Sequence, residues 1–69
     1  MNTAHGANTM TNDYSNRTDA ELFFIMADAS KAAGFAAEIG NAASECKYLD
    51  QVNDANTELN RRRRDAANK

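Results

Sequence analysis

Apolar residues recur along this chain with the spacing that is typical of two long helices. Between residues 18 and 40 they follow one another in steps of three and four, at Leu22, Ile25, Ala29, Ala32, Ala36 and Ile39. Such steps place side chains on one face of a helix, as in the seam of a coiled coil. A second series has the same steps, at Leu49, Val52, Asn56 and Leu59. Its polar member either sets the register of the seam or faces solvent on a helix that is rotated from this estimate.

The residues around these two series predict where each helix begins and ends. Thr18 and Glu21 fit a capping box, so the first helix begins after Thr18. Gly40 suits the position that follows a helix, and Asn41 suits the N-cap of the next one. Gly34 is expected inside the first helix, at a cost of about 1 kcal/mol relative to alanine. Because so short a connection joins antiparallel neighbours, the two helices should form a hairpin.

Both ends of the chain are polar and do not continue the apolar pattern. Residues 1–17 are rich in Asn, Thr and Ser, which predicts a disordered N-terminal arm. The alternative is that this arm, which could form a third short helix, folds back over the exposed apolar face of the hairpin. Residues 65–69 are expected to form a frayed basic tail. The predicted fold class is therefore all-α: an antiparallel hairpin of two long helices over residues 18–64, between the arm and the tail.

Alanine dominates the hydrophobic residues, and this leaves the predicted hairpin with a poor core. The chain has 69 residues and is 42% hydrophobic, but about half of that fraction is alanine. Apolar burial then barely offsets the entropy cost of ordering two helices. Phe23, Phe24 and Phe35 lie beside or off the first apolar series, so we expect them on the surface. A second copy of the chain, as a homo-oligomer, or a different protein would then cover them.

The net charge of −2 hides an uneven distribution along the chain. Residues 13–58 carry nine acidic and three basic residues, whereas residues 61–69 carry five basic residues and one acidic residue. The acidic part favours a protein partner with a basic surface, and the basic part favours nucleic acid. Five acids on the predicted helices are candidate steering charges for a protein partner: Asp28, Glu38, Asp50, Asp54 and Glu58.

The run Arg61–Arg64 is the sharpest local feature of the sequence. Four adjacent arginines can contact phosphates, which would make nucleic acid a partner. Consecutive helical residues point about 100° apart, however, so the four guanidinium groups would surround the helix axis rather than form one face. The other interpretation is a solubilising cap that suits the C-terminal end of the helix dipole, with Glu58 and Arg62 paired one turn apart.

Few residues in the chain are suited to catalysis or to metal binding. One Cys and one His rule out an internal disulfide and a zinc finger. His5 lies in the predicted arm and Cys46 is expected to be a small buried hydrophobe, which disfavours a Cys–His nucleophile pair. Asp50 with Asp54, and Asp54 with Glu58, have the i,i+4 spacing that could hold a divalent cation, but a solvated acidic face is the favoured interpretation. We therefore expect no cofactor, no metal and no enzymatic activity.

The sequence also indicates a compartment. Its longest strongly apolar run, residues 22–27, is far shorter than the ~20 residues of a membrane-spanning helix. The first residues show no basic start followed by an apolar run, and the chain has a single cysteine. Together these features favour the cytoplasm and no membrane partner.

In size and charge the chain resembles small acidic helical proteins that block nucleic-acid-handling machinery, including the anti-CRISPR proteins of phages and other mobile elements. This resemblance implies an inhibitor that occupies a basic groove built for nucleic acid. The primary hypothesis is therefore a non-enzymatic protein that binds a larger protein through the three phenylalanines, with the five acids as steering charges. One alternative is a nucleic-acid-associated accessory protein that acts through Arg61–Arg64. Another is a purely structural helical oligomerisation module.

Overall fold

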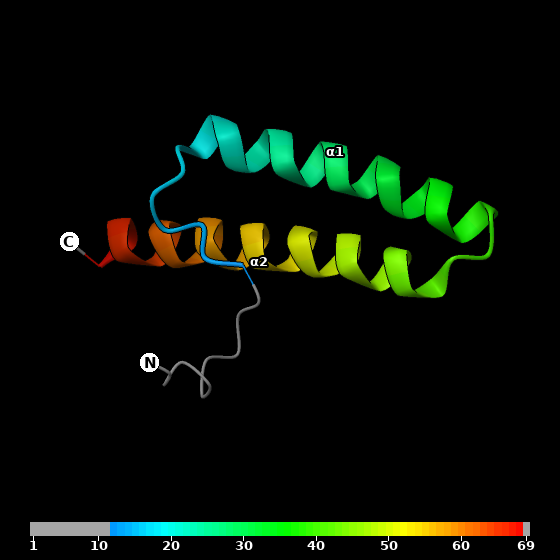
Figure 1. Ribbon diagram of the computed structural model, residues 1–69. Coiled ribbons are helices and arrows are strands. Elements are labelled where there is room, and N and C mark those ends of the chain that lie inside the picture. Colours follow the sequence, from blue (N-terminus) through cyan, green and yellow to red (C-terminus); the bar gives the residue numbers. More distant parts are fainter. Residues whose placement is uncertain (1–11, 69) are drawn as a thin grey trace, which may run out of the picture.

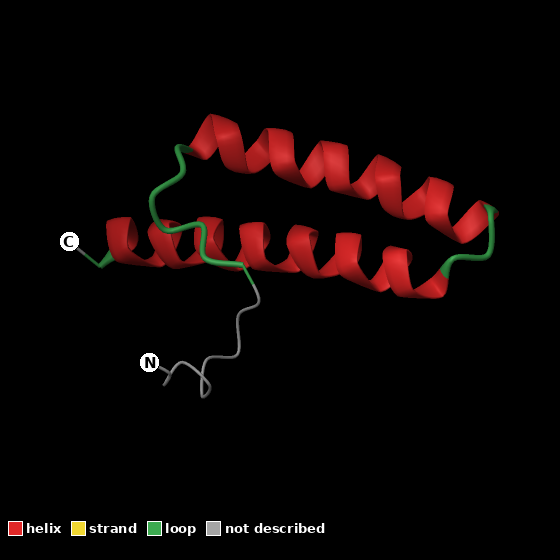
Figure 2. Ribbon diagram, in the orientation of Figure 1, coloured by secondary structure: helices red, strands yellow, loops and turns green. Residues whose placement is uncertain are grey.

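Two antiparallel helices account for most of the described chain. The computed structural model describes residues 12–68. Helix α1 spans Asp19–Glu38 and helix α2 spans Ala42–Ala67, and the two lie side by side (Figure 1). Figure 2 shows loops before α1, at the tight connection between the helices and at the C-terminal end. The predicted all-α helical hairpin is confirmed, and residues 12–68 contain no strand.

The ends of the helices follow the capping residues that the sequence predicts. Oγ1 of Thr18 accepts a hydrogen bond from the backbone N–H of Glu21 at 3.1 Å, and Oε1 of Glu21 accepts one from the N–H of Thr18 at 2.8 Å. Gly40 has a φ of 76°, a left-handed conformation that favours glycine and reverses the chain after α1. The side chain of Asn41 then accepts a hydrogen bond from the N–H of Ser44 at 3.1 Å, and α2 begins.

The hydrophobic core between the helices is small and consists largely of alanine. Two leucines and four alanines are no more than 7% exposed: Leu22, Ala29, Ala33, Ala36, Ala55 and Leu59. Of the first predicted apolar series, Leu22, Ala29 and Ala36 are buried, Ile25 and Ala32 are half-buried, and Ala33 is buried although the series does not include it. Ile39 is 59% exposed, because it follows the last residue of α1 and the chain changes direction there. Since alanine buries little surface, this core contributes less than its number of residues suggests.

The face that α2 turns towards α1 differs from the predicted one by about one residue. Ala55, Glu58 and Leu59 are buried, whereas Asn56 is exposed and Leu49 is 44% exposed. Asn56 therefore faces solvent and does not set the register. The reason is that a buried amide needs hydrogen-bond partners, which the alanine-rich face of α1 does not supply, whereas Ala55 packs there without an unsatisfied group.

Residues 12–17 follow a defined path against the helices, where the sequence predicts disorder. This segment, which we call the strap, passes α2 and then turns into the start of α1 (Figure 1). Tyr14 of the strap packs on the cluster of Leu22, Ala55 and Leu59. Residues 12–17 therefore pack on the hairpin, but Phe23, Phe24 and Phe35 remain exposed, so the strap does not cover the apolar face as the alternative expects. Residues 1–11, which include His5, lie outside the described residues.

Helix α2 continues to Ala67, beyond its predicted end at Arg64. Asp65, which the sequence assigns to a frayed tail, accepts a hydrogen bond from Arg61 one turn earlier at 2.9 Å. An ion pair at this spacing supports the last turns of a helix. Lys69 lies outside the described residues.

Candidate functional site

The three phenylalanines that the sequence assigns to a binding surface are all exposed. The exposed fraction is 57% for Phe23, 69% for Phe24 and 64% for Phe35. Ile39 is a further large apolar residue on the surface, although the sequence pattern assigns it to the seam between the helices. Its place directly before Gly40, the predicted helix stop, is the signal that could have located it outside the core.

Phe24, Phe35 and Ile39 share one flank of α1 and of its C-terminal end. Spacings of eleven and four residues correspond to about three turns and one turn of a helix. We call these three side chains the apolar stripe. Asp28 lies on the same flank, one turn after Phe24, and is exposed. Lys31 is also exposed on this flank, one turn after Asp28, so the stripe is a narrow apolar surface interrupted by one carboxylate and one ammonium group.

Phe23 lies on the other flank of α1. It precedes Phe24 directly, so the two side chains point about 100° apart around the helix. Phe23 borders a shallow hollow together with Leu59, Arg63 and other residues of α2. The three phenylalanines of the prediction are thus divided into two on the apolar stripe and one on a separate surface.

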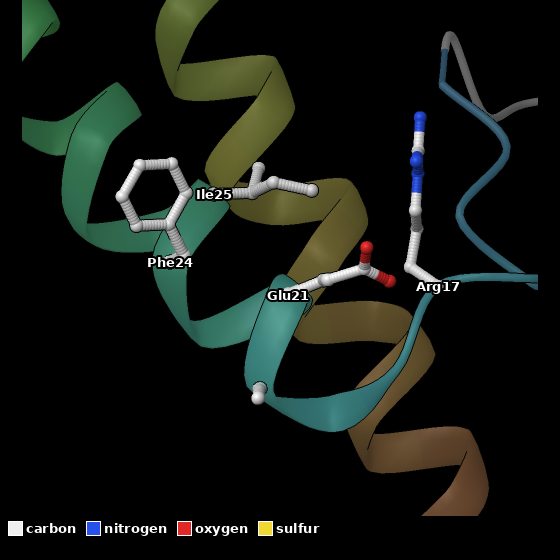
Figure 3. Close-up of a pocket in the computed structure, with 5 residues that line it drawn as sticks. Arg17, Glu21, Phe24 and Ile25 are labelled. Carbon is white, nitrogen blue, oxygen red and sulfur yellow. The ribbon is translucent and has the colours of Figure 1, made fainter.

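At the Phe24 end of the stripe, a shallow hollow is bordered by the last residue of the strap. Its lining includes Ile25 and Glu21 from α1 and Arg17 from the strap (Figure 3). In Figure 3 the Phe24 ring stands out from α1, while the Glu21 carboxylate lies on the side of Arg17. The hydrogen bond from Thr18 holds the pKa of Glu21 below its ordinary value, and the charge of Arg17 acts in the same direction.

At the Ile39 end of the stripe, a second shallow hollow lies near the tight connection between the helices. Phe35 and Ile39 border it on one side, and Tyr48 from α2 borders it on the other. Ala32 and Ser44 also line this hollow. Apolar surface therefore continues from the stripe onto α2 at the closed end of the hairpin.

Four of the five candidate steering acids lie on the surface or near it. Asp28, Glu38 and Asp50 are exposed, and within residues 12–68 none of them forms an ion pair. Asp54 is half-buried and accepts hydrogen bonds from the backbone N–H and the side-chain Nδ2 of Asn12, at 2.9 and 3.1 Å. Three carboxylates are therefore open to a partner, whereas Asp54 is already used to hold the strap.

Glu58, the fifth of these acids, is buried and paired with two arginines. It is 5% exposed, and its carboxylate lies 2.6 Å from Nη2 of Arg61 and 2.7 Å from Nε of Arg62. The hydrogen bonds from Arg61 and Arg62 hold the pKa of Glu58 below its ordinary value. The predicted pairing of Glu58 with Arg62 is confirmed. Glu58 does not fit the role of a steering charge, because its charge is neutralised inside the fold.

Arg62 connects α2 with the start of α1 and with the strap. Its Nη1 atom lies 2.5 Å from Oδ1 of Asp19. Its Nη2 atom donates hydrogen bonds of 3.4, 3.2 and 2.5 Å to three backbone carbonyl oxygens of the strap, those of Tyr14, Ser15 and Arg17. A planar guanidinium with five N–H donors can bind carboxylates and carbonyls in several directions at once. We call Arg62, Glu58 and Asp19 the arginine cluster.

The run of four arginines therefore contains two kinds of side chain. Arg61 and Arg62 bind carboxylates of this chain, whereas Arg63 and Arg64 are exposed and form no ion pair within residues 12–68. Arg63 and Arg64 lie near the C-terminal end of α2, where the helix dipole disfavours an anionic ligand. This arrangement weakens the case for nucleic-acid binding through the run.

The remaining candidate chemistry is sparse in the described part of the chain. Cys46 is exposed, contrary to the prediction of a buried thiol, because it lies two and a half turns before Ala55 and so on the outer face of α2. Residues 12–68 contain no group of three His, Cys, Asp or Glu side chains that could hold a metal ion. Neither described helix has a stretch that is both long and apolar enough to cross a membrane.

The exposed part of the site offers apolar contact and negative charge. Its parts are the apolar stripe, the hollows at its two ends and the three open carboxylates. A surface of this kind can bind a protein by removing the stripe from water. Comparison with known protein families, with curated proteins and with solved structures finds no match for this chain.

Proposed function

We propose that this chain is a non-enzymatic protein that binds a larger protein through the apolar stripe. The observation that carries the proposal is the location of the large apolar side chains. Phe24, Phe35 and Ile39 are each more than half exposed, while the core contains four alanines and two leucines. Large apolar side chains that are exposed along one flank of a small protein commonly mark an interaction site.

Burial of the stripe against a partner would contribute substantially to binding. Fully burying one large apolar side chain contributes roughly 1.5–3 kcal/mol. Three such side chains give a gross gain of several kcal/mol, from which the cost of association is subtracted. A few residues of this kind are sufficient to dominate the energetics of an interface.

The open carboxylates favour a partner with a basic surface. Asp28 lies within the stripe. Glu38 is exposed at the last residue of α1, and Asp50 is exposed on α2. Such charges raise the association rate and set orientation more than they raise affinity. A groove built for nucleic acid carries the required positive charge, so the specific form of the proposal is an anti-CRISPR-like inhibitor of a nucleic-acid-handling protein. We place this partner in the cytoplasm, because the free thiol of Cys46 fits a reducing compartment.

Two other functions have weaker support. Nucleic-acid binding through Arg61–Arg64 would rely on Arg63 and Arg64, since Arg61 and Arg62 are engaged by carboxylates of this chain. A structural oligomerisation module would also cover the stripe, but it would bring together two copies of the same acidic surface.

The test compares the double variant Phe24→Ser/Phe35→Ser with the single variant Phe23→Ser in a quantitative pull-down. Tagged proteins are incubated with lysate of the cells that produce the chain, with and without nuclease treatment, and mass spectrometry quantifies each captured protein. We expect a protein whose capture is equal for the wild type and Phe23→Ser and falls at least about tenfold for the double variant. Phe23→Ser is the matched control, because it removes a similarly exposed ring from the other flank of α1.

Circular dichroism at 222 nm verifies that every variant keeps its helical content. The proposal is wrong if all captured proteins bind the double variant as well as the wild type. Capture that disappears on nuclease treatment would instead favour a role for the arginines in nucleic-acid binding.

A further inference from the structure

The flank of α1 that carries the apolar stripe has a palindromic order of side chains. Four exposed residues follow one another in steps of four, three and four: Phe24, Asp28, Lys31 and Phe35. Such steps keep side chains on one face of a helix, as in a coiled coil. We call this series the outer seam. From either end it presents a ring, two groups of opposite charge and a second ring, and it carries no net charge.

A second copy of the chain matches the outer seam when two α1 helices pack antiparallel about a twofold axis. With the axis between Ala29 and Ser30, Phe24 of one copy lies level with Phe35 of the other. Asp28 of each copy then lies level with Lys31 of the other. Helix α1 spans Asp19–Glu38, so its midpoint is one residue from this axis. The two helices therefore overlap over nearly their whole length.

The residues beyond the two rings are compatible with the same arrangement. Ile39 lies level with Ala20 of the other copy, and Ala20 lines the shallow hollow beside Phe24. A small residue at this position leaves room for the isoleucine side chain. Glu21 and Glu38 also lie level with one another. They are about 100° apart around the helix and so lie on opposite edges of the outer seam, where the two carboxylates do not meet.

Other pairings of two copies do not match in this way. A parallel pairing places Asp28 level with Asp28 and Lys31 level with Lys31, which brings like charges together. Sliding the antiparallel pair by seven residues in either direction places a phenylalanine level with Lys31 or with Asp28. Charged residues within an apolar seam lower its stability but specify its register and its partner. The order of the outer seam therefore selects one register of one partner, a second copy.

We infer that a second copy of this chain covers the stripe through this antiparallel contact, and that it leaves when the larger partner binds. Helix α2 packs against the buried side of α1, so its acidic residues lie away from the contact. One helix from each copy forms the contact, so we expect a dissociation constant on the order of 100 µM, which a partner can overcome. This exchange rests on the proposed function, because it requires a larger protein that binds the same rings.

Sedimentation equilibrium of the full-length chain tests the contact and its register. The protein is measured from about 10 µM to about 1 mM, with a thiol reductant because Cys46 is exposed. We expect the average mass to rise from that of a monomer towards that of a dimer. Asp28→Lys alone and Lys31→Asp alone should each weaken the dimer at least about tenfold, because like charges then lie level with one another.

Mixing the two variants separates the proposed register from a general effect of charge. An equimolar mixture of Asp28→Lys and Lys31→Asp chains should form the dimer again, because each lysine then lies level with an aspartate of the other copy. Asp50→Lys and Lys47→Asp are the matched controls on α2 and should weaken the dimer less than about threefold. A wild type that stays monomeric throughout overturns the inference. A mixture that stays monomeric overturns the register.

Photo-crosslinking tests the exchange with the larger partner. The photoreactive residue p-benzoylphenylalanine replaces Phe35, and this chain is irradiated together with isotope-labelled wild-type chain. We expect crosslinks to residues around Phe24 of the labelled copy and none around its Phe35. Adding lysate of the cells that produce the chain should lower these crosslinks while crosslinks to one larger protein increase. The same probe at Phe23, on the other flank of α1, is the control and should give neither kind of crosslink.

The outcomes separate this inference from the proposed function. Crosslinks to a larger protein without crosslinks to the labelled copy would overturn the second copy and leave the proposed function intact. Crosslinks to the labelled copy that persist while the larger protein is captured would overturn the exchange. If the labelled copy is crosslinked and no larger protein is captured at any amount of lysate, the contact between copies is supported, and both the exchange and the proposed function are wrong.

Discussion

Where the strap meets the helices, a carboxylate is buried, and along the outer flank of α1 aromatic rings are exposed. Glu58 is 5% exposed, whereas Phe24 and Phe35 are 69% and 64% exposed. Soluble domains usually show the reverse distribution. The difference lies in the partners: Glu58 is held by Arg61 and Arg62, whereas no described segment of the chain covers the two rings.

The comparison shows how each region serves the protein. In residues 12–68 no buried side-chain polar atom lacks a hydrogen-bond partner, so the charges of the arginine cluster are stabilised inside the fold. Arg62 adds polar contacts over more than forty residues of sequence to the apolar contacts that Tyr14 makes with the core. The strap end of the hairpin therefore serves stability, and the stripe is available for recognition.

The largest expected effect is a loss of stability when the core under the strap is truncated, compared with truncation of a ring in the stripe. Leu22 is fully buried, so Leu22→Ala should lower the free energy of unfolding by about 2–5 kcal/mol, which is enough to unfold a domain of this size. Phe35→Ala removes a larger side chain but should change the free energy of unfolding by less than about 0.5 kcal/mol, because the ring is already exposed. Urea denaturation followed by circular dichroism measures both. A loss from Phe35→Ala as large as that from Leu22→Ala would show that the ring belongs to the core.

A somewhat smaller effect is expected from Arg62→Gln, which removes the donor to the strap. Loss of the contacts to Glu58 and to the strap carbonyls should lower the urea midpoint and free Tyr14 from the helices. Acrylamide quenching of Tyr14 fluorescence, in a Tyr48→Phe background, should then approach that of free tyrosine.

Arg63→Gln provides the control for this substitution, because Arg63 is exposed and forms no ion pair within residues 12–68. Its urea midpoint and its tyrosine quenching are expected to equal those of the parent chain. Unchanged quenching in Arg62→Gln would mean that Tyr14 is held by packing on Leu22 and Leu59 rather than by Arg62.

The third expected effect is a pH dependence that originates in Glu58. Hydrogen bonds from Arg61 and Arg62 lower its pKa from 4.5 in the folded chain, so the unfolded chain binds the proton more readily. This contribution to stability is fully present when the pH is above the pKa of Glu58 in the unfolded chain. It is lost as the pH falls through the lower pKa of Glu58 in the folded chain. Urea midpoints measured between about pH 6 and pH 2 should fall with acid for the wild type and fall less for Glu58→Gln.

Glu38→Gln is the control for the pH series, since Glu38 is exposed and has no ion-pair partner among the described residues. The urea midpoint of Glu38→Gln should fall with acid as much as that of the wild type. An identical fall in Glu58→Gln would assign the pH dependence to other carboxylates of the fold, such as Glu21 of the capping box.

The parts of the fold that follow from neighbouring residues could be predicted from the sequence. Thr18 and Glu21 mark the start of α1 through a local exchange of hydrogen bonds, and Gly40 and Asn41 mark the turn in the same way. The exposure of the phenylalanines was also predictable, because they lie off the helical period of the seam. In each case the deciding feature is a hydrogen bond or a spacing between residues that are four positions apart or fewer.

The parts that depend on distant residues could not be predicted in this way. Asn12 binds Asp54 and Arg62 binds the strap across more than forty residues, and no local pattern indicates which polar groups will meet. The rotation of α2 that buries Ala55 and exposes Asn56 depends on the shape of the α1 face. The sequence therefore predicted the helices and the aromatic candidates, but not the use of Glu58 and Arg62 inside the fold.

The smallest expected effect concerns Gly34, which lies inside α1 on a side of the helix away from the stripe. A Cβ atom at this position would meet nothing within 4 Å, so Gly34→Ala should raise the free energy of unfolding by about 0.5–1 kcal/mol through the lower entropy of the unfolded chain. Gly40→Ala is the contrasting control and should lower it by roughly 1–2 kcal/mol, because φ is positive there. Gly34→Ala should also leave capture of the partner unchanged. A gain in stability accompanied by weaker capture would mean that folding and recognition share the same part of α1.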